Sequence, residues 1–509
     1  MTCPRPIGIY CQNFNQIQCG SEGLDWGMVR GGSRRVAAAG AAVAFACAVG
    51  LATTVSAAPS AVPGKPSKPV KLDSLPGGWT EPRVVVGPDG TYWAVTNARS
   101  RTAVVYSSGD GGKHWAKTPA DLPGQQAASA DVDIVITHTG RIIITELDGA
   151  ALKFITGYTD DRGHTWHQST GTSIADTDRP WLALGPIDRS TQQPRVYLLF
   201  HNLLTGALAH EMFVSTSTDG GATFGPPVPI TLPGSQAFLD LQCGDSGAPS
   251  ALAVDQRTGR IYAVFGTRTS VLGGCGASAT GTFEINVVGE TRIWVATSLD
   301  GSVGSWTDHL AYDAAPRTIS ASFETAAIDP TGKLFIAFSE TARGYPSFSE
   351  ASVRYIWSGS EATAWARPVT VKSGSPVGTY DPTVVATGAG RLAIAYYQGT
   401  TAVPKPTWSV RLAMVTDATG SHLVIRRSVL DSRIAYKETA DSMGGSCSGS
   451  GPLAGVQNGF VCHRANDDFG LVVDKHCRLV AVYPMVATME GTWATTRPLG
   501  SFCKDGTRA

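Results

Sequence analysis

The residues best suited to chemistry are acidic side chains that stand immediately before short apolar runs. They are Asp131, Asp133, Asp176, Asp178, Asp245, Glu324, Asp381, Asp467 and Asp468. Carboxyl groups serve as general acids and bases, and a pair about 5 to 10 Å apart is what glycoside cleavage requires. Such groups also bind a cation or the hydroxyls of a sugar. At any single position the simpler interpretation is that the acid caps a turn.

The elements that carry these acids form a repeat of two apolar strands joined by a tight turn. Seven copies begin at Pro82, Asp131, Asp178, Ala248, Glu324, Asp381 and Asp468. A hairpin cannot bury both faces alone, so a repeated hairpin predicts radial stacking in a β-propeller. Two further strands before each next copy complete a four-stranded antiparallel blade. In the seventh copy Cys477 replaces the turn glycine, so six blades plus an appendage stay open as the alternative to seven.

The predicted propeller places the acids together. The innermost strand of every blade begins at the same end of the axis, so acids that precede these strands would form a ring there. For the ring as a whole, a role in ligand binding is favoured over none. We also expect residues 70–80 to close the propeller by pairing with the last blade.

Composition agrees with a turn-rich β protein and excludes two classes. Among 509 residues are 58 Gly and 30 Pro, which disfavour helix interiors. The 42% hydrophobic content can bury a core, which excludes a disordered chain. The 41 Lys and Arg residues balance 41 Asp and Glu residues, which argues against a nucleic-acid binder.

The amino terminus predicts export. Residues 1–27 lack a periodic apolar pattern and are expected to be an unstructured preface, with a wrongly assigned start as one explanation. Residues 28–57 combine a basic start, an apolar run and a small-residue cleavage site before Ala58, as in a signal peptide. A membrane anchor is the alternative, because about 20 apolar residues can span a bilayer. We expect a linker over 58–69, one propeller domain over 70–509, secretion, and no stable membrane insertion after cleavage.

The cysteines that follow the signal are even in number, which suggests up to three disulfides in an exported chain. They are Cys243, Cys275, Cys447, Cys462, Cys477 and Cys503. Proximity in sequence favours pairing the first two together and the last four among themselves. No CxxC or HExxH pattern occurs, so neither a structural zinc site nor a zincin is expected. No cofactor is predicted.

A second motif follows the first three hairpins. Residues 108–115 (SGDGGKHW), 159–166 (TDDRGHTW) and 217–224 (STDGGATF) share Ser/Thr-x-Asp-x-Gly-x-x-aromatic. The spacing suits a turn in which hydroxyl and carboxylate bind backbone amides, glycine takes positive φ and the ring packs between sheets. The aspartates are therefore structural. This motif resembles the Asp box, or BNR repeat, of the sialidase superfamily, whose members are β-propellers that act on glycans.

The resemblance also implies site residues. Glu324 stands where a glutamate supports a tyrosine nucleophile, Arg343 follows the second strand of that hairpin, and Tyr380 stands at the nucleophile position. A neighbouring base such as Glu324 would activate the tyrosine. Arg99, in Asn-Ala-Arg, matches the family's Glu-Ala-Arg. Asp131 is the further catalytic candidate, and Arg99, Arg343, Asp178, Asp245 and Asp381 are the substrate-binding candidates.

The sequence also departs from the sialidase pattern. Thr80 stands in place of the arginine that binds the substrate carboxylate, and no aspartate lies between Arg99 and Ser108 where the family carries its acid/base. Both departures argue against ordinary sialidase action. Two hypotheses follow: a secreted glycoside hydrolase with a non-standard site, or a non-catalytic propeller that binds glycans or proteins at the cell surface. Trp79 and Trp181 are the candidates for stacking on a sugar. The oligomeric state is left open.

Overall fold

The computed structural model describes most of the chain after residue 62. The described residues are 63–73, 81–97, 103–120, 122, 129–148, 153–171, 177–202, 211–241, 249–267, 290–319, 324–341, 351–374, 378–399, 407–437, 469–485 and 491–503. All belong to the unit of residues 59–509. The expected preface and signal peptide lie outside the described residues, as do Cys243, Cys275, Cys447 and Cys462. Within the part described, no helix is long and apolar enough to span a bilayer.

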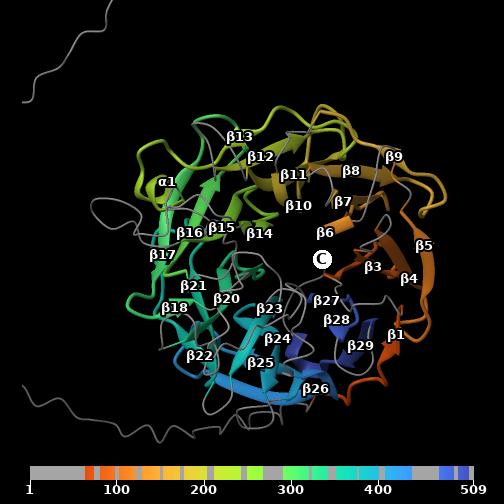
Figure 1. Cartoon of the computed structure of the whole chain (residues 1–509), viewed down its shortest axis with the longest axis vertical. Helices are drawn as coiled ribbons and strands as arrows, with labels where there is room; N and C mark the ends of the chain where they lie inside the picture. The colour runs from red at the N-terminus through yellow and green to blue at the C-terminus, as the bar shows by residue number, and fades with distance from the viewer. Residues whose placement is uncertain are drawn as a thin grey trace, which may run out of the picture. The chain divides into compact units, whose positions relative to one another are not determined.

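The described strands form seven antiparallel sheets arranged around an axis (Figure 1). One strand of each sheet lies nearest the axis. These strands are β2 (Arg83–Val86), β6 (Ser129–Ile136), β10 (Thr177–Ile187), β14 (Pro249–Val254), β19 (Thr325–Ile328), β23 (Thr379–Gly388) and β27 (Gly470–Val473). The seven-bladed propeller predicted from the hairpin repeat is confirmed, and the six-bladed alternative is wrong.

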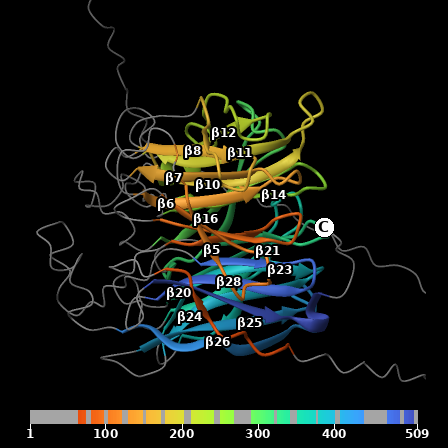
Figure 2. The same ribbon diagram turned by 90° about the vertical axis from the view of Figure 1, so that its right-hand side faces the viewer.

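The second and third strands carry most of the buried apolar side chains. The second strands are β3 (Tyr92–Thr96), β7 (Ile142–Asp148), β11 (Pro194–Asn202), β15 (Ile261–Thr267), β20 (Leu334–Thr341), β24 (Arg391–Gly399) and β28 (Arg478–Met485). The third strands are β4 (Val104–Ser108), β8 (Lys153–Thr159), β12 (Met212–Ser217), β16 (Arg292–Ser298), β21 (Ser352–Ser358), β25 (Thr407–Thr416) and β29 (Gly491–Pro498). Seen from the side, the strands run between the two ends of the ring (Figure 2).

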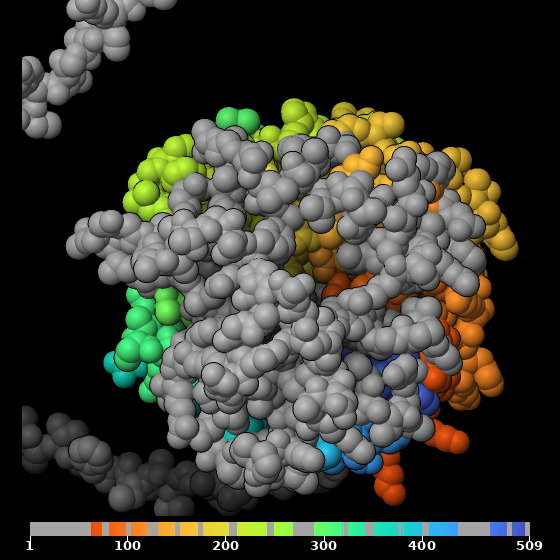
Figure 3. Space-filling view, viewed as in Figure 1, coloured from red at the N-terminus to blue at the C-terminus, as the bar shows by residue number. Residues whose placement is uncertain are grey.

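The outermost strands form the rim, part of which is visible in Figure 3. They are β5 (Ala116–Pro119), β9 (His167–Gln168), β13 (Val228–Pro229), β17 (Thr307–Asp313), β22 (Val369–Lys372), β26 (Val424–Lys437) and β1 (Val70–Lys71). One blade departs from the expected four strands, because β18 (Thr318–Ile319) and β19 both pair with β20. Two short helices complete the described elements, α1 (Gln236–Leu241) and the 3-10 turn η2 (Gly500–Cys503).

The ring closes as predicted, through the beginning of the domain. Strand β1 pairs antiparallel with β29, with Val70 opposite Ala494. Backbone hydrogen bonds extend this pairing on both sides, from Gly64 to Pro498 and from Leu72 to Thr492. The last blade therefore takes its outer strand from the other end of the domain, so it cannot be complete until both ends have folded.

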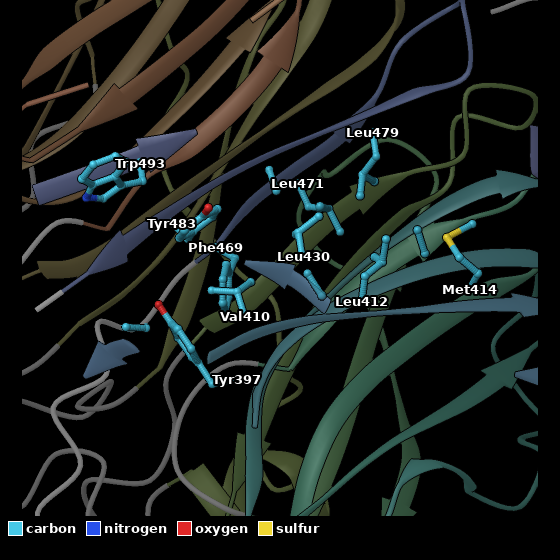
Figure 4. Packing of buried hydrophobic residues seen from close by; sticks show 14 of the residues in the cluster. Tyr397, Val410, Leu412, Met414, Leu430, Phe469, Leu471, Leu479, Tyr483 and Trp493 are labelled. Atoms are coloured by element: carbon cyan, nitrogen blue, oxygen red, sulfur yellow. The ribbon is translucent and has the colours of Figure 1, made fainter. Parts of the chain in front are cut away.

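Apolar side chains between neighbouring sheets hold the blades together. Figure 4 shows the cluster between the last two blades, where Leu412, Met414 and Leu479 lie fully or almost fully buried. Burying a Leu or Met side chain contributes about 1.5 to 3 kcal/mol. A disulfide joins Cys477 to Cys503 beside this cluster, a pairing among the last four cysteines as expected. Cys477 adopts positive φ at the turn where most hairpins have glycine.

Candidate functional site

The Asp boxes confirm their structural interpretation. In the turn at residues 217–224, the amides of Ala222 and Thr223 donate to Asp219 at 3.1 and 2.9 Å, and the amide of Gly221 donates to Ser217 at 2.9 Å. Phe224 is 5% exposed. These turns join the third and fourth strands, at the end of the ring opposite to the point where the innermost strands begin. The candidate site is therefore at the other end.

The innermost strands enclose an axial cavity of about 230 Å³. Its wall includes residues from all seven blades, among them Arg83, Asp133, Trp181, Ser250 and Thr383. The predicted acids Asp131, Asp178 and Asp381 lie at the beginnings of innermost strands, and Glu324 directly precedes one. These four residues therefore lie at the same end of the ring, and none of them lines the cavity.

Asp131 and Asp178 come together on neighbouring blades, and Glu81, just before β2, joins them. Asp131 is 7% exposed and Asp178 is 8% exposed. Burial raises the pKa of Asp131 well above its usual value, and the charges of Glu81 and Asp178 raise it further. Burial also opposes the ionisation of Asp178, but His201 and Arg179 together lower its pKa below the usual value. The pKa values of these two adjacent carboxyl groups are therefore shifted in opposite directions. Asp131 is favoured as the protonated acid and Asp178 as the carboxylate.

The backbone is irregular next to Asp178. A register shift between Asp178 and Trp181 interrupts the pairing of β10 with β11. Within it Arg179 has φ of 54°, although it precedes a proline and is not glycine. Residues before proline favour extended conformations, and a left-handed non-glycine residue costs about 1 to 3 kcal/mol. Strain of this kind persists where surrounding contacts hold it, and here the Arg179 Nε lies 3.9 Å from Asp178 Oδ2.

Arg83 and Asp133 form a neighbouring pair inside the cavity wall. Arg83 Nε lies 4.0 Å from Asp133 Oδ1, and the amide of Leu182 donates to Asp133 at 2.7 Å. The guanidinium of Arg83 lies 4.4 Å from the centre of the Trp181 ring. Trp181 itself is 2% exposed and donates to the carbonyl of Pro249. The expectation that Trp181 is free to stack on a sugar is wrong, because its ring is covered by Arg83 and its N–H is engaged. Trp79 lies outside the described residues.

Glu324 forms a second acidic cluster, on the fourth and fifth blades. It is 1% exposed, and its Oε2 accepts a hydrogen bond from Ser250 on β14. Burial raises the pKa of Glu324, while hydrogen bonds involving Ser250 and Glu290 oppose that rise. The other oxygen, Oε1, has no hydrogen-bond partner within the part of the chain described. Glu324 is thus a buried carboxyl with increased proton affinity, next to Ser250 and Glu290.

Asp381 and Tyr380 lie at the start of β23, on the sixth blade. Asp381 is 8% exposed and has φ of 53° before a proline, inside a register shift between Tyr380 and Thr383. A positive φ before a proline, inside a register shift, therefore occurs here as it does next to Asp178. Burial, together with the charges of Asp381 and Asp431, raises the pKa of the neighbouring Tyr397 well above its usual value. The side chain of Tyr380 lies outside the described part of the structure.

Three predicted binding residues, Arg99, Arg343 and Asp245, lie outside the described residues. Of the described candidates, the structure joins Asp131 to Asp178 and places Glu324 in a separate cluster. Among the residues described, no group of three or more His, Cys, Asp or Glu side chains is placed to hold a metal ion.

Sequence reasoning missed three members of these clusters. Glu81 carries the signal used for the other acids, since it stands just before the first strand of a hairpin. His201 lies directly opposite Asp178 in the β10–β11 pairing, but two register shifts separate this pair from the turn, so counting along the hairpin does not find it. Glu290 precedes β16 and meets Glu324 only through the packing of two blades, for which the sequence carries no local signal.

Comparisons with known proteins agree with the repeat. Residues 83–320 match the family model described as a BNR repeat-like domain. This range covers the first four blades, and the match confirms the Asp-box β-propeller predicted from the sequence. No curated protein matches the chain in sequence.

Several solved structures resemble the chain in fold at low identity. An ulvan lyase has 12% identity and a TM-score of 0.49, over 85% of this chain and 94% of its own. An α-L-arabinanase from Penicillium chrysogenum has 12% identity and a TM-score of 0.42, over 86% of this chain and 99% of its own. The NanB sialidase from Streptococcus pneumoniae has 11% identity and a TM-score of 0.40, over 87% of this chain and 71% of its own.

Proposed function

We propose that this propeller binds glycans at the end of the axis where the innermost strands begin, and that it hydrolyses a glycosidic bond there with Asp131 as the proton donor. The observation that carries the proposal is the buried pair Asp131 and Asp178, in which one carboxyl is held as the acid and the other as the carboxylate. Glycoside hydrolysis needs a carboxylic acid whose pKa is raised, so that it still carries a proton at neutral pH.

Asp178 acts on Asp131 and not on the substrate. The two carboxyl groups interact directly, whereas two carboxyls that act on opposite sides of a scissile bond stand about 5 to 10 Å apart. The negative charge of Asp178 instead keeps the proton on Asp131. A second group is therefore needed, either a nucleophile that attacks the anomeric carbon or a base that activates water. In this proposal it comes from another blade.

Glu324 and Tyr380 are our candidates for that second group. The raised pKa of Glu324 makes it a stronger base than an exposed glutamate, and a tyrosine needs such a base to act as a nucleophile. In this proposal a carboxylate oxygen of Glu324 accepts the phenol proton. We assign substrate binding to Asp381 and to Arg99, Arg343 and Asp245.

The second candidate function is a non-catalytic propeller that binds glycans or proteins. Thr80 favours it, because it replaces the arginine that would bind a substrate carboxylate. Losing one arginine of a buried carboxylate clamp costs about 2 to 5 kcal/mol in binding. This alternative keeps the acidic ring as a binding surface and requires no proton transfer.

The two functions are separated by assaying the full chain on a panel of fluorogenic glycosides together with a glycan array. If the enzyme hypothesis is right, one glycoside is turned over, and Asp131→Asn lowers kcat about 10²- to 10⁴-fold. Asp160→Asn is the matched control, because Asp160 lies at the opposite end in an ion pair with Arg141. Glycan binding without turnover would support the binding module. The absence of both turnover and glycan binding would contradict hydrolysis and glycan binding, and would leave protein binding as the remaining alternative.

A further inference from the structure

His201 is a buried histidine that the proposed proton transfer does not yet use. It lies near the end of β11, directly opposite Asp178 in the pairing with β10, and is 5% exposed. Its Nε2 lies 3.6 Å from Asp178 Oδ2. Within the described residues, neither ring nitrogen has a hydrogen-bond partner. At least one of these nitrogens carries a hydrogen, and a buried donor without an acceptor is unfavourable.

The surroundings of His201 direct that hydrogen to Asp178. The charged groups around His201 and Asp178 are Arg179 on β10 and Asp131 on β6, with Glu81, before β2, next to Asp131. Arg179 supplies positive charge near Asp178, but its Nε is 3.9 Å away. The Nε2 of the imidazole approaches the same oxygen more closely, at 3.6 Å.

We propose that His201 is a positioning residue of the carboxyl pair: its Nε2–H, directed at Asp178, keeps the negative charge on Asp178 and thereby leaves the proton on Asp131. This inference rests on the proposed function for its catalytic meaning. The arrangement itself belongs to the protein without a ligand. The histidine determines which of two adjacent carboxyl groups is the acid, so it directs the proton without touching the substrate.

The experiment follows the carboxyl protons directly, by infrared spectroscopy of the full chain labelled with ¹³C in the aspartate carboxyls. The protonated carbonyl band is recorded against pH in the absence of ligand, and Asp131→Asn identifies the band of Asp131. The matched variants are His201→Gln, whose amide reaches the position of Nε2, and His201→Asn, whose amide reaches that of Nδ1. Thermal unfolding of each variant shows that it is folded.

We expect His201→Asn to raise the pH at which Asp178 ionises by about one to two units, because the imidazole N–H that lies 3.6 Å from the carboxylate is removed. The proton is then shared between the two aspartates, so the band assigned to Asp131 weakens at neutral pH. His201→Gln should remain close to wild type. Superimposable titrations of wild type and a folded His201→Asn would overturn the proposal.

A purely structural role for His201 predicts a different result, namely lower thermal stability in both variants with an unchanged carboxyl titration. If His201→Asn does not fold, a His201→Gln titration that differs from wild type by more than one pH unit would also contradict the proposal. The measurement requires no substrate. If the protein binds no glycan, the proposed function is refuted. The infrared titration still decides whether His201 controls the protonation of the two aspartates.

Discussion

Glu211 offers a quantitative test of how burial shifts the pKa of acids at the end of the propeller where the innermost strands begin. It precedes β12 and is 1% exposed. Its Oε1 accepts the amide of Met212 at 2.9 Å, and its Oε2 accepts the hydroxyl of Thr231 at 2.6 Å. Burial raises its pKa from 4.5 to about 7, although the hydrogen bonds from Thr231 and Met212 oppose the rise. The folded protein therefore holds the proton of Glu211 more tightly than the unfolded chain.

The raised pKa determines the sign of the pH dependence. Below pH 4.5 Glu211 is protonated in both states, and its full contribution to stability is present. As the pH rises through about 7, the folded protein must ionise a buried carboxyl, and that contribution is lost. The difference between 4.5 and about 7 corresponds to about 3 kcal/mol at 25 °C.

The perturbation is Glu211→Gln, which stays neutral at every pH. Its amide oxygen can accept the Met212 amide, and its NH₂ can donate to the hydroxyl of Thr231. Relative to wild type, the variant should gain about 3 kcal/mol in the free energy of unfolding between pH 4.5 and pH 8. Urea unfolding of both proteins across this range measures the gain, and other titrating groups cancel in the difference. A difference that does not change with pH would refute the reasoning.

Two further predictions concern the frame that positions the site. Asp219→Ala removes the acceptor of two turn amides and should lower the free energy of unfolding by about 1 to 3 kcal/mol. Asp219→Asn keeps an acceptor and should lower it less. Equal losses of the two variants in urea unfolding would contradict the turn interpretation. Removing the Cys477–Cys503 disulfide, which closes a separation of 26 residues, should lower the free energy of unfolding by about 3 to 4 kcal/mol as Cys503→Ser. Unchanged unfolding in that variant would show that η2 holds its place without the bond.

The architecture could be predicted because its signals are local. A hairpin repeat shows in the alternation of apolar residues, and each Asp box contains its own hydrogen-bond partners within eight positions, as Ser217 and Asp219 show. The direction of the innermost strands follows from the repeat, so Asp131, Asp178, Glu324 and Asp381 could be expected to gather at one end. Closure by the segment around Val70 was predicted for the same reason, since a ring of sheets leaves one strand to be supplied.

The chemical character of these acids depends on contacts between blades, which no local pattern encodes. Asp131 and Asp178 carry the same side chain before similar strands, and only packing separates them. Both feel the charge of Arg179, but Asp178 also meets His201, whereas Asp131 meets the carboxyl groups of Glu81 and Asp178. Trp181 looked available in the sequence, but the folded chain covers it with Arg83 from another blade. Composition and spacing therefore determined the ring and the end of it that carries the acids. Burial and neighbours distant in sequence, which set the free energy of each charge, decided which acid keeps its proton.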